Sequence, residues 1–207
     1  ALRSASGASL AAREDRGLPS GVIGCPPFAG MRCGRGSEGT TKMAGREHHY
    51  RVIVRWTGNT GSGTEHYRSY SRSHEIACPA APDKPVIPGS SDPAFRGDPN
   101  RWNPEELLVA TLSACHKLWY LHLCAAAGVV VESYVDEAEG VMMESDDGSG
   151  RFTSVTLRPH ILITRTQDLE KAHSLHHEAH AKCFIANSVN VPVRVEATIS
   201  AADQPAR

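Results

Sequence analysis

Polar and apolar residues alternate with a period of two in several segments, the first of which is residues 49–56 (HYRVIVRW). One face of this segment carries its large apolar side chains, Tyr50, Val52, Val54 and Trp56. Successive side chains of a strand point to opposite faces of a sheet, so the pattern predicts a half-buried strand. Residues 57–64 (TGNTGSGT) then predict a turn, and extended character resumes over 65–78. The chain therefore opens with an antiparallel pair of strands.

Residues 79–101 hold six prolines, which exclude a helix or a central strand there. A loop of this length is either a plain connector or a functional lid or pocket wall. The following run, WNPEELLVATLSACHKLWYLHLCAAAG, predicts a long helix. Asn103 suits its N-cap, Pro104 its first position and Gly128 its end. Because apolar residues occur nearly all round this helix, we expect it to be buried on most sides, by sheet or by a partner subunit.

The rest of the chain predicts further strands and one more helix. Alternation recurs over 129–142, SDDGSG predicts a hairpin turn, and 151–164 predicts a strand with a bulge or edge at Pro159. A second helix is expected over about 167–183, and VPVRVEATIS predicts a closing strand. The order has no series of strand–helix–strand units, so the predicted fold class is α+β.

Composition narrows the classes of function. The formal net charge of −1 gives no reason to expect nucleic acid, and no apolar run approaches the ~20 residues that span a bilayer. Six loosely spaced cysteines in 207 residues do not form a disulfide framework, which predicts a cytoplasmic protein with reduced thiols. Residues 1–42 show no apolar periodicity and are interpreted as a disordered leader or a non-native extension, which leaves 43–207 as the domain.

Cys115 lies in the middle of the first predicted helix. It is either a core residue, as burial statistics favour, or a reactive thiol. A mid-helix thiol gains little from the helix dipole, so activation requires a nearby cation. Glu105 lies ten residues earlier, roughly 15 Å along the axis, and could act only by anchoring an arginine that reaches back to the sulfur. His116 points about 100° away from Cys115 and is a poor general base for it.

Cys183 ends the second predicted helix. Two cysteines on two helices can meet if the helices pack face to face. A sulfenic acid formed on one is then resolved by the other as a disulfide, and that cycle needs neither a metal nor an organic cofactor.

Two runs that contain these cysteines resemble the OsmC/Ohr family, which is named for osmotic induction and organic hydroperoxide resistance. They are NPEELLVATLSACH (103–116) and HHEAHAKCFIANSV (176–189). The resemblance covers about residues 43–200. It implies an OsmC-like fold with antiparallel sheets around two central helices, in an intertwined homodimer whose sites lie at the subunit interface.

The resemblance also implies an activity, the reduction of organic hydroperoxides by a thiol peroxidase. By motif position, Cys115 would be the peroxidatic cysteine, Cys183 the resolving cysteine and Glu105 the carboxylate that orients an activating arginine. An external dithiol would restore the enzyme, and no cofactor or metal is implied.

This chain departs from the family pattern at the arginine. The family arginine usually lies in the first hairpin loop, but residues 57–64 contain none. Arg72, Arg96 and Arg101 are the candidates to replace it, and the sequence does not distinguish between them.

Four histidines lie along one stripe of the second helix, at the spacing i, i+3, i+4 and i+7: His173, His176, His177 and His180. With Cys183 they could hold a metal, or they could be partly exposed side chains near a subunit seam. A second hypothesis is therefore a non-enzymatic binding or redox-sensing protein, with a metal on the His173, His176 and His180 stripe.

Overall fold

The computed structural model describes residues 45–203, and a compact unit within it begins at His48. The leader expected at 1–42 lies outside the described residues. The strands are β1 (Ile53–Trp56), β2 (His74–Ala77), β3 (Ile87–Gly89), β4 (Val131–Asp136), β5 (Glu139–Glu144), β6 (Gly150–Leu157), β7 (Pro159–Ile163), β8 (Val193–Val195) and β9 (Thr198–Ala201). The helices are α1 (Pro104–Ala127) and α2 (Leu169–Lys182), with short 3₁₀ turns η1 (Pro93–Phe95), η2 (Thr166–Asp168) and η3 (Ala186–Ser188).

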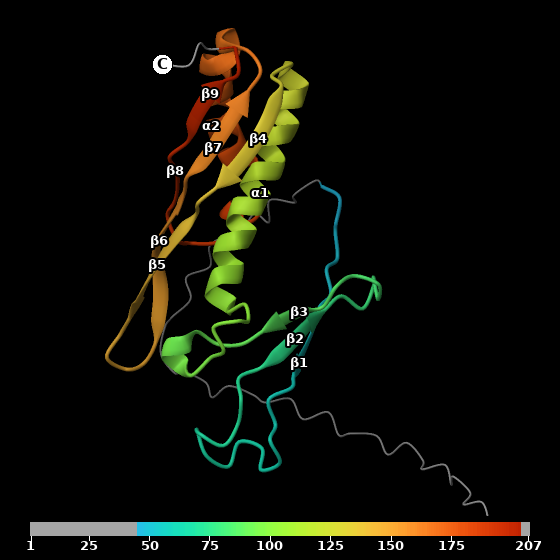
Figure 1. The fold of residues 1–207 in the computed structure, drawn as a ribbon, viewed down its shortest axis with the longest axis vertical. Coiled ribbons are helices and arrows are strands. Elements are labelled where there is room, and N and C mark those ends of the chain that lie inside the picture. Colours follow the sequence, from blue (N-terminus) through green and yellow to red (C-terminus); the bar gives the residue numbers. More distant parts are fainter. Residues whose placement is uncertain (1–44, 204–207) are drawn as a thin grey trace, which may run out of the picture. The chain divides into compact units, whose positions relative to one another are not determined.

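These strands form three sheets of three strands, in the orders β1-β2-β3, β4-β7-β9 and β5-β6-β8. Figure 1 shows α1 running alongside β4, and α2 also packs against α1. The expected α+β class is confirmed. Four of the six strand pairings are antiparallel, whereas β6 with β8 and β7 with β9 are parallel.

The segment expected as one strand over 151–164 is two strands in different sheets. β6 ends at Leu157, and β7 begins at Pro159. Proline has no N–H for a ladder, so it fits the first residue of a strand, where the chain crosses from one sheet to the next. The closing segment divides in the same way, because β8 pairs with β6 and β9 pairs with β7. The strands expected at 49–56 and 65–78 are also shorter than predicted, at four residues each.

α1 begins and ends where the sequence predicts. Asn103 Oδ1 accepts a hydrogen bond from the Glu106 N–H at 2.7 Å, and Glu106 Oε2 accepts one from the Asn103 N–H at 3.1 Å. This reciprocal capping box satisfies two backbone donors that the first turn leaves without helical partners. Gly128 ends the helix in the left-handed conformation, with φ of 74°, which a residue without Cβ adopts freely.

Within a single chain, α1 is covered on one side, so the expected cover on most sides is not provided by sheet alone and cover by a partner subunit stays a prediction. Its buried side chains form one side: Leu112, His116, Tyr120, Leu123 and Cys124. Leu118, on another side, is 64% exposed. By length and composition alone, α1 would also suit a membrane span, as core helices of soluble proteins do. The buried side of α1 packs against α2 and the β4-β7-β9 sheet. We therefore interpret α1 as a core helix whose opposite side is exposed in the single chain.

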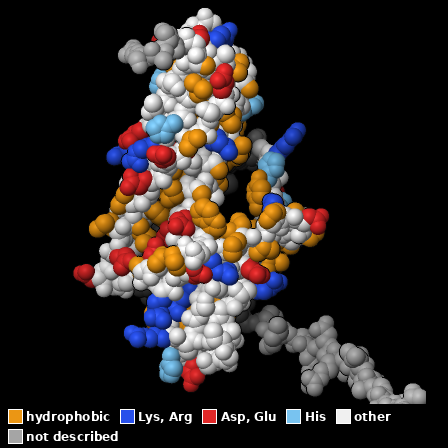
Figure 2. All heavy atoms as spheres, viewed as in Figure 1, with side chains coloured by type: hydrophobic (Ala, Val, Ile, Leu, Met, Phe, Trp, Pro, Cys, Tyr) orange, Lys and Arg blue, Asp and Glu red, His pale blue; other side chains and the backbone are white. Residues whose placement is uncertain are grey.

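The β1-β2-β3 sheet supplies none of the buried apolar side chains in residues 45–203. The face of residues 49–56 that was expected to be buried is exposed, from Trp56 at 42% to Tyr50 at 88%. Figure 2 shows apolar side chains exposed over α1 and this sheet. The alternation identifies the strand correctly, but its apolar face is left exposed by the other residues between 45 and 203.

Candidate functional site

The structure brings Cys115 and Cys183 together. Cys115 lies in the middle of α1, and Cys183 is the residue that directly follows α2. The backbone N–H of Cys183 donates a hydrogen bond to the His180 carbonyl, as in a continuing helix. The two helices pack against each other, and the Cys115 thiol lies close enough to Cys183 to contribute to the raised pKa of Cys183. Both cysteines are reduced. The packing of two helices that are far apart in the sequence therefore creates a dithiol site.

The two thiols have different surroundings. Cys183 is 1% exposed, whereas Cys115 is partly exposed. Burial raises the pKa of Cys183 to about 11, and the neighbouring Cys115 adds to this rise. The Ala186 N–H donates to Cys183 Sγ at 3.5 Å and offsets part of it. A thiol with a raised pKa stays protonated at neutral pH, so Cys183 is poorly suited to attack first, and a dissolved substrate meets the Cys115 sulfur more easily.

Glu105 lies in the first turn of α1 and lines a hollow of about 590 Å³ together with Trp102, Tyr134 and Asp136. Cys115 does not line this hollow. Within residues 45–203, no arginine forms an ion pair with Glu105. The structure therefore does not bring Glu105 to the two thiols within one chain, as the helical spacing of ten residues already implies.

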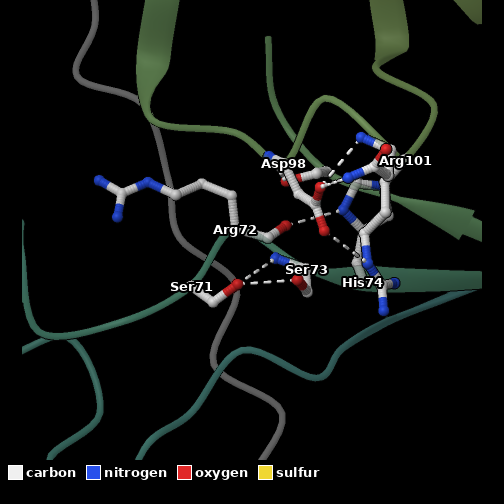
Figure 3. Close-up of polar contacts among 8 residues, drawn as sticks. Ser71, Arg72, Ser73, His74, Asp98 and Arg101 are labelled. Carbon is white, nitrogen blue, oxygen red and sulfur yellow. Dashed lines mark hydrogen bonds and ion pairs between the residues drawn. The ribbon is translucent and has the colours of Figure 1, made fainter. Parts of the chain in front are cut away.

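Two of the candidate arginines are held by their own loops. Arg72 donates from Nη1 to the Tyr70 carbonyl and from Nη2 to the Tyr67 carbonyl, both at 2.7 Å. Arg101 Nε lies 3.6 Å from Asp98 Oδ2. Figure 3 shows the Arg72 guanidinium pointing away from Asp98 and Arg101.

Arg96, the third candidate, is exposed and forms no ion pair with any residue between 45 and 203. None of the contacts that the structure gives for the three arginines reaches Cys115. The structure of a single chain therefore does not identify which of the three arginines would activate Cys115.

A pair of buried histidines lies between the helices. His116 Nε2 is 3.0 Å from His176 Nδ1, and the two rings are parallel within 4°. The Tyr120 ring stacks on His176 with a centroid distance of 4.0 Å. Burial lowers the pKa of His116 to about 4 and that of His176 to about 3, so both rings are neutral at pH 7.

The sequence does not reveal this pair, because His116 and His176 are 60 residues apart. The only available signal was a polar residue inside the apolar pattern of each helix. His173 and His177 are exposed, and His176 uses Nδ1 for His116. Within residues 45–203, no three His, Cys, Asp or Glu side chains are grouped to hold a metal ion. The metal site suggested for His173, His176 and His180 is therefore not formed in the described part of the chain.

Together these features define a class of protein, an α+β fold in which two helices place a partly exposed and a buried cysteine side by side. Comparison with known proteins agrees with this description. The model of the OsmC-like protein family matches residues 97–198, which include both cysteines. An OsmC-like protein of unknown function from Vibrio cholerae is 32% identical to this chain and superposes with a TM-score of 0.65. That alignment covers 73% of this chain and 100% of the Vibrio protein. The chain belongs to the OsmC-like family.

Two more distant relatives add to the picture. The uncharacterized protein YmaD of Bacillus subtilis is 23% identical over 159 residues, which are 74% of this chain and 95% of YmaD. The organic hydroperoxide resistance protein OhrB of the same species is 22% identical with a TM-score of 0.51, over 73% of this chain and 98% of OhrB. At this identity the likeness to OhrB shows the shared fold.

Proposed function

We propose that the protein is a thiol-dependent peroxidase that reduces organic hydroperoxides. The observation that carries this proposal is the proximity of Cys115 and Cys183, one partly exposed and one buried. Membership of the OsmC-like family and the likeness of fold to an organic hydroperoxide resistance protein support it. A reducing compartment such as the cytoplasm suits a protein whose described cysteines are all free.

In the proposed reaction, each of the two sulfur atoms has one role. The Cys115 thiolate attacks the distal peroxide oxygen, the O–O bond breaks, and the alkoxide leaves as the alcohol after taking a proton. Cys115 is then a sulfenic acid, oxidised by two electrons. The Cys183 sulfur attacks it, a disulfide forms and water leaves. An external dithiol reduces the disulfide and returns both thiols.

The buried position of Cys183 suits this second role. A thiol kept protonated by a raised pKa does not compete for the peroxide. It also lies close enough to Cys115 for that thiol to raise its pKa, which makes it the nearby partner that a disulfide requires. The short life of the sulfenic acid that follows from this proximity limits further oxidation of Cys115.

We further propose that the working form is a homodimer. Leu118 on α1 and the apolar face of β1 are exposed in one chain, and surfaces of this kind mark contacts with other proteins. A second copy could also bring Glu105 and an arginine towards the Cys115 of its partner, which a single chain does not do. Sedimentation of the wild type and of Leu118→Glu tests the assembly. A wild type that sediments as a monomer would contradict it.

The experiment that tests the peroxidase is intact mass with thiol counting after one equivalent of cumene hydroperoxide. We expect the loss of two thiols, mapped to Cys115 and Cys183. Cys78→Ser serves as the matched control, because Cys78 is partly exposed but lies outside this pair. An unchanged thiol count would overturn the peroxidase and favour a non-enzymatic binding or redox-sensing role.

A further inference from the structure

The side chain of Trp119 on α1 contacts the residues on both sides of Cys183. The Phe184 ring lies edge-on to the Trp119 ring, with a centroid distance of 5.5 Å and an interplanar angle of 86°. The Lys182 ammonium lies 5.7 Å from the centroid of the same ring, within the range of a cation–π interaction. The segment that carries Cys183 is therefore attached to α1 through one aromatic ring.

This ring lies one helical turn from Cys115. Trp119 follows Cys115 by four residues, and side chains at this spacing lie one above the other on a helix. A long helical side chain also leans over the turn that precedes it, which here is the turn that carries Cys115. Phe184, the partner of Trp119, is joined to Cys183 by one peptide bond. The aromatic contact and the dithiol are therefore adjacent at the junction of the two segments.

The position of Cys183 is not fixed by α2 alone. The helix ends at Lys182, and the backbone of Cys183 is extended, with ψ of 109°. The following residues Ile185 and Ala186 pack against the cluster around Leu112, on the turn of α1 that precedes Cys115. Trp119 lies on the turn of α1 that follows Cys115. Contacts on both sides of Cys115 therefore hold this segment against α1.

Trp119 and Phe184 differ in how firmly the rest of the chain holds them. Trp119 packs against the core cluster that contains Tyr120 and Leu123. Phe184, in contrast, is 69% exposed. Edge-to-face aromatic pairs contribute stability beyond the area that they bury, so this contact is significant even at an exposed position. It joins a ring that the core fixes to a ring that is otherwise open to solvent.

We propose that Trp119 is a positioning residue for the Cys115–Cys183 disulfide. Through Lys182 and Phe184 it keeps the Cys183 sulfur near Cys115, and it takes no part in the bond changes itself. Two groups held in this way react with each other as if each were present at a high effective concentration. The use of this device in the peroxidase cycle rests on the proposed function, but the positioning can be measured without a peroxide.

Equilibration of the full chain with glutathione redox buffers tests the proposal. One glutathione disulfide oxidises the two protein thiols, the Cys115–Cys183 bond forms, and two glutathione thiols are released. Mass spectrometry after acid quenching and alkylation gives the equilibrium constant, which is the effective concentration of the two thiols. We expect Trp119→Leu to lower it about tenfold, and Trp119→Phe, which keeps a ring, to restore most of the loss. An unchanged constant in Trp119→Leu would overturn the proposal.

Two further variants separate positioning from a general loss of stability. Phe184→Ala changes an exposed side chain, so the fold is retained, and the constant should again fall about tenfold. The His122 ring also contacts Trp119, at a centroid distance of 5.9 Å, but it belongs to α1 itself. His122→Ala therefore removes a neighbour of Trp119 without releasing Cys183, and it should leave the constant unchanged. Equal losses in the two variants would contradict the positioning role.

The same variants distinguish this role from the proposed peroxidase. With cumene hydroperoxide, Phe184→Ala should form the sulfenic acid at the wild-type rate and the disulfide about tenfold more slowly, as dimedone trapping over time shows. A wild type that does not react with the peroxide, but whose constant with glutathione falls in Phe184→Ala, would overturn the peroxidase and support the positioning role. Equal constants in the wild type and Phe184→Ala would overturn the positioning role alone.

Discussion

The rings of His116 and His176 lie parallel across the contact between α1 and α2, with His116 Nε2 3.0 Å from His176 Nδ1. Each ring has one further nitrogen, His116 Nδ1 and His176 Nε2, that is buried without a hydrogen-bond partner in the described chain. The pair links the helix that carries Cys115 to the helix that precedes Cys183. Its protonation state therefore affects the packing that holds the dithiol site together.

We expect the protein to lose stability on mild acidification. The pKa values of His116 and His176 are lowered by burial to about 4 and about 3, from an ordinary value of 6.5. Between the lowered and the ordinary pKa values, the unfolded chain binds more protons than the folded one. The free energy of unfolding is therefore highest above about pH 6.5 and falls as the pH decreases. At pH 5 the loss is on the order of 2 kcal/mol for each independent histidine.

Urea unfolding at pH 7.5, 6 and 5 measures this loss, and this range stays above the ordinary carboxylate pKa values. Free energies of unfolding that are equal at the three pH values would contradict the assignment of both rings as buried and neutral.

His176→Ala should destabilise the fold by about 2–4 kcal/mol, because it opens a cavity beside Tyr120 and leaves His116 Nε2 without its partner. The neighbouring His177 is exposed on the same helix, so His177→Ala should stay within about 0.5 kcal/mol of the wild type. Chemical denaturation of both variants measures the difference. Equal effects would show that α2 tolerates loss of the buried ring.

Cys183→Ser should stop the proposed peroxidase after one turnover, with a sulfenic acid accumulating on Cys115 because no thiol is present to resolve it. Trapping with dimedone followed by peptide mass spectrometry identifies the modified cysteine. In Cys115→Ser, by contrast, no sulfenic acid should form at Cys183, whose thiol is buried and whose pKa is raised. A dimedone adduct on Cys183 in that variant would reverse the two roles.

Asn103→Ala should reduce the stability of α1, because it removes the side-chain acceptor of the capping box at 2.7 Å from the Glu106 nitrogen. The expected loss is about 0.5–2 kcal/mol. Asn100 lies just before the helix in an exposed turn, which makes Asn100→Ala a matched control with a smaller effect. Thermal unfolding compares the two variants, and a lower Tm for Asn100→Ala than for Asn103→Ala would contradict the role of the cap.

Local signals in the sequence predict the elements that depend on nearby residues. The capping residues of α1 and the glycine that ends it act over a single turn, so Asn103, Pro104 and Gly128 are recognisable from sequence alone. The two motifs around Cys115 and Cys183 likewise identify the family, because their residues are consecutive in the chain. The period-two pattern finds β1, but it does not show which molecule covers its apolar face.

Other features depend on contacts between residues far apart in the chain, and only the tertiary structure decides them. The sequence alone establishes an α+β chain with one thiol within a helix and a second thiol at the end of another. The fold decides that Cys115 and Cys183 lie close together and that His116 pairs with His176. Periodicity reports which side of an element is apolar. Which residues pack against that side depends on contacts between segments that are 60 or more residues apart, as for His116 and His176. A local sequence pattern contains no information about such contacts.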